Sequence, residues 1–270
     1  MAEKPIVVGA VAYTPNVVTV WEGFRDYFRE TGVPVDYVLY SNYEAQVDAL
    51  FNRHIDVAWN TNVAYVRSEQ RAAGACQVLA MRNVDVGYTS RFIVRAQAGI
   101  RTLAEIKGKR FAFGSADSAQ AALIPAYYLR QAGIDPERDI TALHFDLDVG
   151  KHGDTGTSEL EVLRAIQEGE ADAGAVGDAT WVRLLEQGKI NTAIARAIWT
   201  TPPYCHCNFT ALPDFDPERG RAWTDALLRM DYNDSRWRPF MELEGVTRWL
   251  PGQKEGYEAV YASLGVAETA

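Results

Sequence analysis

Residues 110–125 read Arg110-Phe-Ala-Phe-Gly-Ser-Ala-Asp-Ser-Ala-Gln-Ala-Ala-Leu-Ile-Pro125. The apolar run before Gly114 predicts a buried strand, and the segment Ser118–Ala132 predicts a helix that closes at Gly133. A strand that runs through a glycine-bounded loop into a helix is the repeating unit of an α/β sheet. The same stretch also places a polar loop directly after a strand, where such sheets bind ligands.

Strand–helix alternation continues on both sides of this stretch. Before it we predict strands at Ile6–Ala12, Val35–Tyr40, Ile55–Trp59 and Gln77–Arg82, separated by helices at Val17–Thr31, Asn42–Phe51 and Val63–Ala73. After it we predict strands at Ile140–Asp146, Ala173–Val176, Ala193–Trp199 and Cys207–Leu212, with helices at Ser158–Glu168, Thr180–Gln187, Glu218–Arg229, Arg236–Glu242 and Glu255–Leu264. Two sets of such units, joined by extended passages, predict an α/β fold with two lobes, a central cleft and two hinge passages. Lobe 1 would hold residues 1–90 plus 200–270, and lobe 2 residues 91–199.

The composition excludes several classes of protein. The chain has 270 residues, of which 47% are hydrophobic and 23% charged, as in an ordinary globular protein with a large core. Its formal net charge of −9 disfavours a nucleic-acid partner. Three cysteines cannot build a disulfide scaffold, and no apolar run is long enough to cross a membrane.

The amino-terminal apolar run bears on location. Ile6–Ala12 resembles a signal peptide only in being short and has no separate cleavage region, so it predicts a first core strand. As written, the sequence therefore predicts a cytoplasmic protein. A chain whose leader had been removed would read the same and would be periplasmic or extracellular.

Polar residues follow the predicted strands in five loops. Helix N-termini in such loops offer unpaired N–H groups and partial positive charge, and hydroxyls, amides, Lys151 or His152 would add to them. The alternative is ordinary helix capping by Asp117, Ser118, Thr155 and Ser158. The expected ligand-binding residues are Tyr13, Thr14, Asn60, Thr61, Tyr88, Ser115, Ser118, Gln120, His152, Asp154 and Thr155.

Three stretches give the chain a resemblance to a known family. They are residues 43–65, residues 87–133, which include Leu103-Ala-Glu-Ile-Lys-Gly-Lys-Arg-Phe-Ala-Phe113, and residues 166–176, Ile166-Gln-Glu-Gly-Glu-Ala-Asp-Ala-Gly-Ala-Val176. In order and spacing they resemble the phosphonate/phosphite-type solute-binding proteins of ABC importers, which have the type 2 periplasmic-binding-protein fold. The resemblance implies that fold, a small-molecule ligand and an ABC permease as partner.

The ligand loop departs from the family pattern. That family commonly carries a Ser-Thr-Ser-Gly-like run at the helix start, seven residues before the proline, and its hydroxyls hold the oxyanion. Here the matching positions are Ser118-Ala-Gln-Ala121, so one hydroxyl remains and Gln120 offers an amide instead. An oxyanion, a carboxylate-bearing ligand and an uncharged polar ligand are all compatible with these residues.

Pro202-Pro-Tyr-Cys-His-Cys-Asn208 lies on the predicted return passage. In an extended chain Cys205 and Cys207 would point one way and His206 the other. These thiols are interpreted as buried structural groups, with ligand contact or a soft-metal site as alternatives, because the four ligands and spacing of a zinc site are absent. The aromatic stretch 230–252 is interpreted as packing on lobe 1, with an interface as the alternative.

Two functions follow from these patterns. The first is a binding protein that closes on a small polar or anionic ligand and needs no cofactor or metal. The second is a cytoplasmic enzyme, of lyase or cofactor-biosynthesis type, that uses His152, Asp154, Cys205 or His206 on the same scaffold. We favour the binding protein because no nucleophile or nucleotide motif is present. The oligomeric state stays open.

Overall fold

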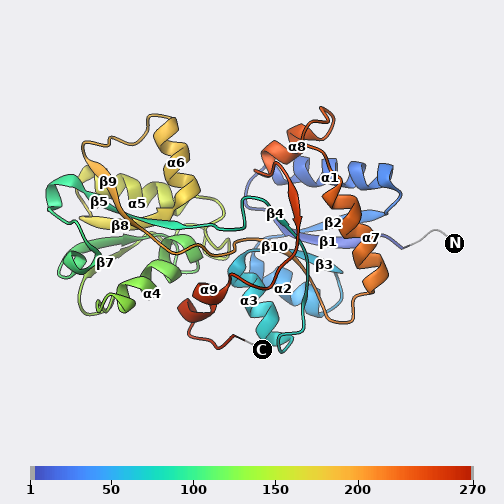
Figure 1. Ribbon diagram of the computed structural model, residues 1–270, viewed down its shortest axis with the longest axis horizontal. Helices are drawn as coiled ribbons and strands as arrows, with labels where there is room; N and C mark the ends of the chain where they lie inside the picture. Colours follow the sequence, from blue (N-terminus) through green and yellow to red (C-terminus); the bar gives the residue numbers. More distant parts are fainter. Residues whose placement is uncertain (1–3, 269–270) are drawn as a thin grey trace. The chain divides into compact units, whose positions relative to one another are not determined.

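The computed structural model describes residues 4–268, which divide into two compact units (Figure 1). Unit 1 holds the residues up to Gly87, Cys205–Tyr257 and Glu268, and unit 2 holds Tyr88–Tyr204 and Glu258–Ala267. Each unit is built on one sheet covered by helices, so the α/β fold class predicted from the sequence is confirmed. No helix within residues 4–268 is both long and apolar enough to span a membrane.

The sheet of unit 1 has the strand order β11-β4-β10-β3-β1-β2. β1 pairs in parallel with β2 and β3, whereas β10 is antiparallel to both β3 and β4. Because β1 and β3 are parallel, the loops that follow them start at the same edge of the sheet. The strands are β1 (Ile6–Val11), β2 (Val35–Tyr40), β3 (Val57–Asn60), β4 (Gln77–Arg82), β10 (Asn208–Ala211) and β11 (Trp249–Pro251).

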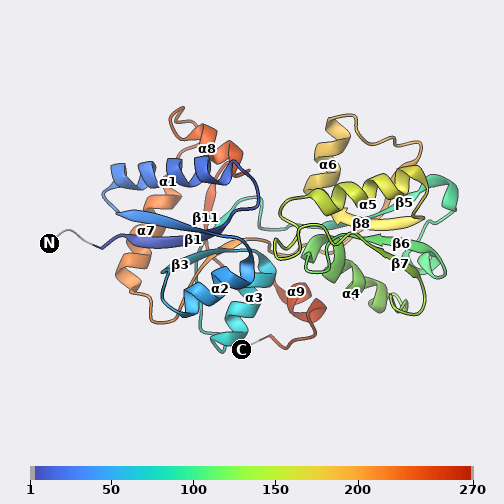
Figure 2. The same ribbon diagram turned by 180° about the vertical axis from the view of Figure 1, so that it is seen from behind.

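Helices cover both faces of this sheet (Figures 1 and 2). α1 (Val17–Thr31), α7 (Pro217–Leu228) and α8 (Arg238–Leu243) share one core, in which Phe28 stacks on Trp223. α2 (Tyr43–Phe51) and α3 (Asn62–Arg71) pack on the other face. The apolar periodicity of residues 17–31 therefore predicted both a helix and its buried side.

The sheet of unit 2 has the order β7-β6-β8-β5-β9. β6 pairs in parallel with β7 and β8, and β5 runs antiparallel to β8 and β9. The carboxyl ends of β6, β7 and β8 therefore meet at one edge, and three loops start there. The strands are β5 (Ser90–Arg95), β6 (Arg110–Phe113), β7 (Thr141–His144), β8 (Ala173–Gly177) and β9 (Ala195–Thr200).

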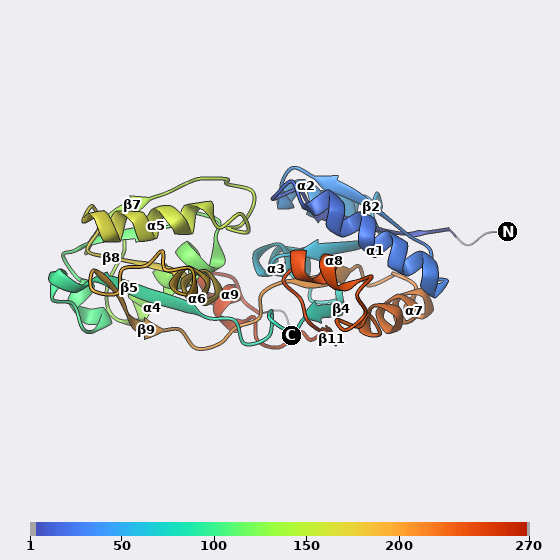
Figure 3. The ribbon, with the colours of Figure 1, turned by 90° about the horizontal axis from the view of Figure 1, so that it is seen from above.

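Helices also cover both faces of the second sheet (Figure 3). α5 (Thr157–Glu168) and α6 (Asp178–Glu186) pack on one face, and α4 (Ile124–Gln131) packs on the other. The short helical turns are η1 (Ala96–Ala98), η2 (Leu103–Ile106) and η3 (Ala119–Leu123). α9 (Glu258–Ser263) contacts α4 and η3.

The position of α9 differs from the predicted lobe boundaries. Lobe 1 as predicted from the sequence includes all of 200–270, whereas residues 258–267 belong to unit 2 together with Tyr88–Tyr204. The reason is tertiary packing: Val260 and Tyr261 of α9 are buried, and the helix packs on α4 and η3 of unit 2. Helical periodicity identifies the buried side of a helix but not the unit that covers it.

The helix predicted at Ser118–Ala132 begins with a π-turn. Pro125 has no N–H, so it cannot donate to the carbonyl of Ala121 as an α-helix would require. That carbonyl accepts instead from the backbone N–H of Gly114 at 2.9 Å, and Leu123 N–H donates five residues back to the Ser118 carbonyl at 3.0 Å. The missing N–H of Pro125 therefore leaves the Ala121 carbonyl to bond with Gly114, and this bond holds the start of the helix against the end of β6. π-turns are rare and occur often at functional sites.

The aromatic stretch near the carboxyl end packs on unit 1, as favoured from the sequence. Trp237 and Trp249 lie in its core and Phe240 packs against that core, while Leu243 stays exposed. Trp249–Pro251 also forms strand β11 against β4, a strand not expected from the sequence. Three residues are too few to show an alternation.

Candidate functional site

In unit 2, the loop after β6 is bonded to the loop after β7. The hydroxyl of Ser115 donates to the Leu147 carbonyl. Asp117 accepts the backbone N–H of Gly150 at 2.5 Å and that of His152 at 3.4 Å through one carboxylate oxygen. The two loops therefore form one structure at the carboxyl edge of the sheet.

Ser118, Gln120 and Gly153 meet where these loops touch. Ser118 is the N-cap of η3, and its Oγ accepts the N–H of Ala121 at 3.2 Å. A Cβ on Gly153 would lie 2.4 Å from Ser118 Oγ and 2.7 Å from Gln120 Nε2, and the φ of Gly153 is +86°. Only glycine fits such a close approach at this backbone conformation.

The end of β8 completes the arrangement from a third side. A Cβ on Gly177 would lie 2.5 Å from the Tyr88 hydroxyl, 3.1 Å from Glu159 Oε1 and 3.3 Å from Gln120 Cγ. The buried carboxylate of Glu159 accepts the Gly177 N–H at 2.6 Å and the Thr180 hydroxyl at 2.5 Å. We call Tyr88, Ser118, Gln120, Gly153, Glu159 and Gly177 the unit 2 polar cluster.

Charged and titratable groups of the 147–156 loop flank this cluster. His152 is buried and has a φ of +52°, which is uncommon for a residue with a Cβ. Lys151 is half-buried; burial lowers the pKa of its ammonium group, and Asp148 and Asp154 oppose the shift. Lys151 and His152 thus belong to the loop whose Gly153 approaches the Ser118 hydroxyl at the start of η3, and a cation near a helix N-terminus is a chemistry suited to an anion.

Most of the predicted caps have other roles. Ser118 does cap a helix, but Asp117 binds the neighbouring loop, as described above. The N-cap of α5 is Gly156, so neither Thr155 nor Ser158 caps that helix. Thr155 Oγ1 instead accepts the N–H of Thr157 at 3.3 Å, and Asp154 is half-buried in the same loop.

The predicted ligand residues of unit 1 follow β1 and β3. The Tyr13 hydroxyl donates to Glu244 at 3.2 Å, and Thr14 is half-buried beside it in sequence. Thr61 caps α3 by accepting the Ala64 N–H at 3.3 Å. Asn60 is fully buried; it accepts from Gln46 at 2.9 Å and donates to Thr210 at 3.0 Å, so its amide serves the core.

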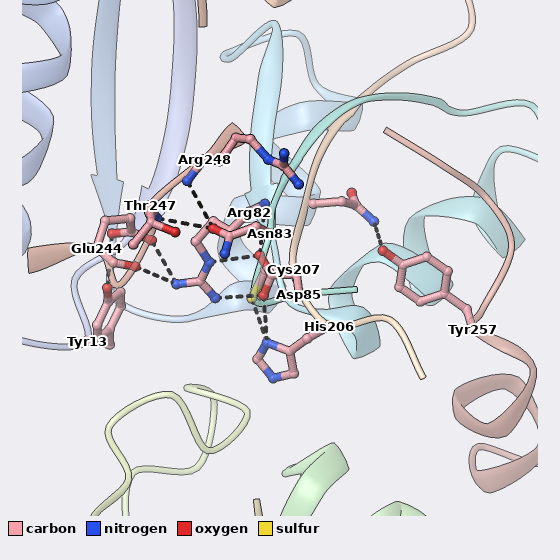
Figure 4. Close-up of polar contacts among 11 residues, drawn as sticks. Tyr13, Arg82, Asn83, Asp85, His206, Cys207, Glu244, Thr247, Arg248 and Tyr257 are labelled. Atoms are coloured by element: carbon pink, nitrogen blue, oxygen red, sulfur yellow. Dashed lines mark hydrogen bonds and ion pairs between the residues drawn. The ribbon is translucent and has the colours of Figure 1, made fainter. Parts of the chain in front are cut away.

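A buried ion-pair network supports Tyr13 (Figure 4). Arg82 donates to Asp85 from Nε at 2.7 Å and from a terminal nitrogen at 2.8 Å. Its other terminal nitrogen donates to the Glu244 carbonyl at 2.7 Å and lies 3.4 Å from the Glu244 carboxylate. Burial by itself would raise the pKa of Asp85, but Arg82 and His206 outweigh it and lower that pKa to about 2.

Two residues of the return passage, together with Asp85 after β4, carry donor atoms that could hold a metal. Oxygen of Asp85, nitrogen of His206 and sulfur of Cys207 all lie within 4.8 Å of one another and are buried. Cys207 Sγ is 3.0 Å from His206 Nδ1, so the alternation expected for an extended 205–207 segment is wrong. Because Asp85 is already paired with Arg82, we interpret this cluster as part of the fold and not as a metal site. All three cysteines are buried, and none of them forms a disulfide in the described part of the chain.

Several residues of the site were not predicted. Gly153, Gly177 and Glu159 were not selected because a glycine or a helix-surface glutamate has no distinctive local pattern. Glu159 lies in the first turn of α5, where acidic residues are common for dipole reasons alone. The three-residue spacing from Gly150 to Gly153 to Gly156 was a usable signal, since all three have positive φ.

Comparison with known proteins gives a family match. The family described as "ABC transporter, phosphonate, periplasmic substrate-binding protein" matches residues 8–257. A probable phosphite-binding protein of an ABC transporter, PhnD1 of Prochlorococcus marinus, is 24% identical over 246 residues, which cover 87% of this chain and 80% of the relative.

Solved structures agree in fold. PhnD1 of Prochlorococcus marinus in complex with methylphosphonate has a TM-score of 0.74 at 21% identity, covering 96% of this chain and 97% of that one. XAC2383 of Xanthomonas citri bound to ATP has a TM-score of 0.75 at 18% identity, covering 98% and 100%. These likenesses confirm the type 2 periplasmic-binding-protein fold expected from the sequence.

Proposed function

We propose that this chain, which belongs to the periplasmic substrate-binding proteins of phosphonate ABC transporters, binds a small phosphonate- or phosphite-type oxyanion and presents it to an ABC permease. The family resemblance drawn from the sequence is confirmed by the match. The family description also supports a periplasmic location, and nothing in the comparisons supports a cytoplasmic one.

The observation that carries the proposed ligand class is the convergence of loops in unit 2. Ser118, the His152–Gly153 backbone and Tyr88 approach one another at the carboxyl edge of β6, β7 and β8. The N-termini of η3 and α5 start at that edge and supply N–H groups and positive partial charge. This local chemistry suits an anion although the chain as a whole carries a charge of −9.

The hydroxyls divide into binding and positioning groups. Ser118 Oγ accepts from Ala121, so its proton remains to donate to a ligand oxygen. Ser115 gives its proton to the Leu147 carbonyl, so its part is to hold the loop in place. We propose Tyr88, Gln120, His152, Asp154 and Thr155 as the other contacts from unit 2. From unit 1 we propose Tyr13, Thr14 and Thr61, whereas Asn60 is not a contact because its buried amide is already bonded to Gln46 and Thr210.

Calorimetric titration of the purified chain with methylphosphonate, phosphite and inorganic phosphate tests the proposal. We expect at least one of them to bind with a Kd of about 1 µM or tighter. Ser118→Ala should weaken binding about 10-fold, since it removes a hydrogen bond to a charged group. Thr102→Ala is the matched control, because it also removes an N-cap in unit 2 but lies on η2. Equal effects of the two substitutions would contradict a ligand role for Ser118.

The enzyme alternative has no support from the relatives described above. Mass spectrometry of the ligand recovered after the titration distinguishes the two functions, because a binding protein leaves its ligand chemically unchanged. Conversion of the ligand that is lost in His152→Ala or Cys205→Ala would instead establish catalysis. The permease partner follows from the family, and its identity needs a co-purification with the membrane components.

A further inference from the structure

The side-chain oxygen of Gln120 is buried without a hydrogen-bond partner among the described residues. Gln120 is 3% exposed, and within residues 4–268 no group bonds to its Oε1. Its Nε2 reaches the Gly153 side of the unit 2 polar cluster, and its Cγ lies at the Gly177 side. Buried amides are almost always hydrogen-bonded, so a carboxamide in the middle of a proposed binding site calls for a partner from outside the protein.

Two more buried atoms near this site lack partners among the described residues. One is Asp117 Oδ1, whose neighbouring Oδ2 holds the 150–152 backbone. The other is Ser158 Oγ, which lies 3.0 Å from where a Cβ on Gly114 would be. A carboxylate oxygen and an amide oxygen can only accept hydrogen bonds, and a hydroxyl can do so too. The unpartnered atoms here are therefore mostly acceptors, which need a hydrogen-bond donor from the ligand. A fully ionised oxyanion has no such donor.

The charges around Gln120 also favour a ligand that carries a proton. Glu159 on α5 brings a carboxylate into the cluster, Asp117 precedes Ser118 and holds the 150–152 backbone, and Asp154 lies on the same loop, which also carries Lys151 and His152. A second negative charge on the ligand would be repelled by these carboxylates in a poorly solvated site. A ligand with a single charge and an O–H group avoids this repulsion.

We infer that Gln120 is a specificity-determining residue that selects a singly protonated phosphonate or phosphite. Its Nε2 donates to an ionised ligand oxygen, and its Oε1 accepts the proton of the neighbouring P–OH group. The inference rests on the proposed function. A serine hydroxyl at position 120 would rotate and donate to any oxyanion, whereas a carboxamide holds one donor and one acceptor in a fixed plane.

The first test compares three singly charged ligands at pH 6 by calorimetry with the unaltered chain. Methylphosphonate is present there largely with a P–OH group, methanesulfonate has no proton, and the monomethyl ester of methylphosphonate carries a methyl group instead of that proton. We expect methylphosphonate to bind about 10-fold to 100-fold more tightly than either. Methanesulfonate and the ester binding within twofold of methylphosphonate would overturn the inference.

The second test uses variants of Gln120. Gln120→Met keeps the length but removes both polar groups, and should weaken methylphosphonate binding about 10-fold or more. Gln120→Ser should narrow the preference for phosphonate over sulfonate to about threefold or less, because a hydroxyl donates to both. Gln131→Met, at an exposed glutamine on α4, is the control and should change neither quantity. A Gln120→Met variant with unchanged affinity and selectivity would overturn the inference.

Thermal unfolding guards against a folding artefact. Because Gln120→Met removes a buried amide oxygen that has no partner among the described residues, the unliganded variant should have a Tm equal to or above that of the unaltered chain. A Tm well below it would mean that the amide serves the fold and would overturn the inference. If none of the three ligands binds the unaltered chain, the proposed function fails too. If all three bind equally, only the role of Gln120 fails.

Discussion

The carboxylate of Asp85 accepts two hydrogen bonds from the guanidinium of Arg82, at 2.7 and 2.8 Å, and Asp85 is fully buried. Its backbone carbonyl also accepts the N–H of His206 at 2.8 Å. The pair therefore ties the end of β4 to the return passage, and Glu244 links it to the Tyr13 hydroxyl. Removing one partner of this network leaves buried charge without compensation.

Arg82→Met should lower the free energy of unfolding by about 3–5 kcal/mol, because Asp85 and Glu244 would stay buried without their cation. Urea unfolding at pH 7 measures the loss. Arg138→Met is the control, since Arg138 is paired with Asp135 but its side chain is 81% exposed, and it should cost less than about 1 kcal/mol. Similar losses in the two variants would contradict the assigned importance of the buried pair.

The low pKa of Asp85 gives the chain an acid-sensitive stability. In the folded chain the pKa is about 2, below its ordinary value of 3.8, so on acidification the unfolded chain takes up this proton first. The contribution is therefore complete above about pH 4 and is lost as the pH falls toward 2, in total about 2 kcal/mol. Urea unfolding at intervals from pH 5 to pH 2 should show it.

A variant without the Asp85 carboxylate isolates this contribution. In Asp85→Asn the titrating group is absent while Arg82 stays beside Glu244, so the difference in stability from the unaltered chain should shift by about 2 kcal/mol between pH 5 and pH 2. Parallel stability curves over that range would mean that Asp85 does not have the depressed pKa.

Gly153→Ala should disturb both the loop and the ligand. A Cβ there would meet Ser118 Oγ at 2.4 Å and Gln120 Nε2 at 2.7 Å. Gly133 has a similar φ, +80° against +86°, but nothing lies within 4 Å of its Cβ position. Gly133→Ala should therefore cost only the backbone strain, about 1 kcal/mol, and leave methylphosphonate binding unchanged.

Gly153→Ala should lower the Tm more than Gly133→Ala does. It should also weaken methylphosphonate binding about 10-fold, since Ser118 and Gln120 must move. Calorimetric titration of both variants makes the comparison. If Gly153→Ala binds as well as Gly133→Ala, the close approach of the two loops is not needed for the ligand.

Cys76 should resist alkylation in the folded chain. Burial, together with the carboxylate of Glu69, raises the pKa of its thiol to about 12, so little thiolate forms at pH 8. Iodoacetamide treatment at pH 8 followed by peptide mass spectrometry should leave the Cys76 peptide unmodified. The same treatment in urea is the control and should label it fully. Labelling of Cys76 at equal rates with and without urea would contradict its burial.

The sequence predicted the fold well where the signal is local. Residues 17–31 bury the predicted face, Gly32 and Gly133 have the positive φ of helix ends, and the loops after parallel strands converge as sheet geometry requires. It failed where the outcome depends on distant partners. Strand β11 exists because β4 pairs with it, and α9 packs on unit 2 although most of its sequence neighbours belong to unit 1.

The loops that form the site could be predicted from the sequence, but most contacts between their side chains could not. Ser118, Gln120 and Tyr88 were found because polar residues after strands are conspicuous, and the structure brings them together around Gly153 and Gly177. The capping expected of Thr155 and Ser158 was wrong because Gly156 begins α5. The contact of His206 with Cys207 could not be read from a two-residue alternation, because the segment before β10 is not a strand.

The strand order of unit 1 has a consequence for biosynthesis. β10 separates β4 from β3, so the amino-terminal strands cannot close into one sheet until residues 208–211 have left the ribosome. The sheet of unit 2, with every strand between residues 90 and 200, is fully translated earlier. Synthesis of unit 1 therefore begins before that of unit 2 and ends after it. Its nascent strands keep unpaired edges during that time, which makes them candidates for chaperone protection.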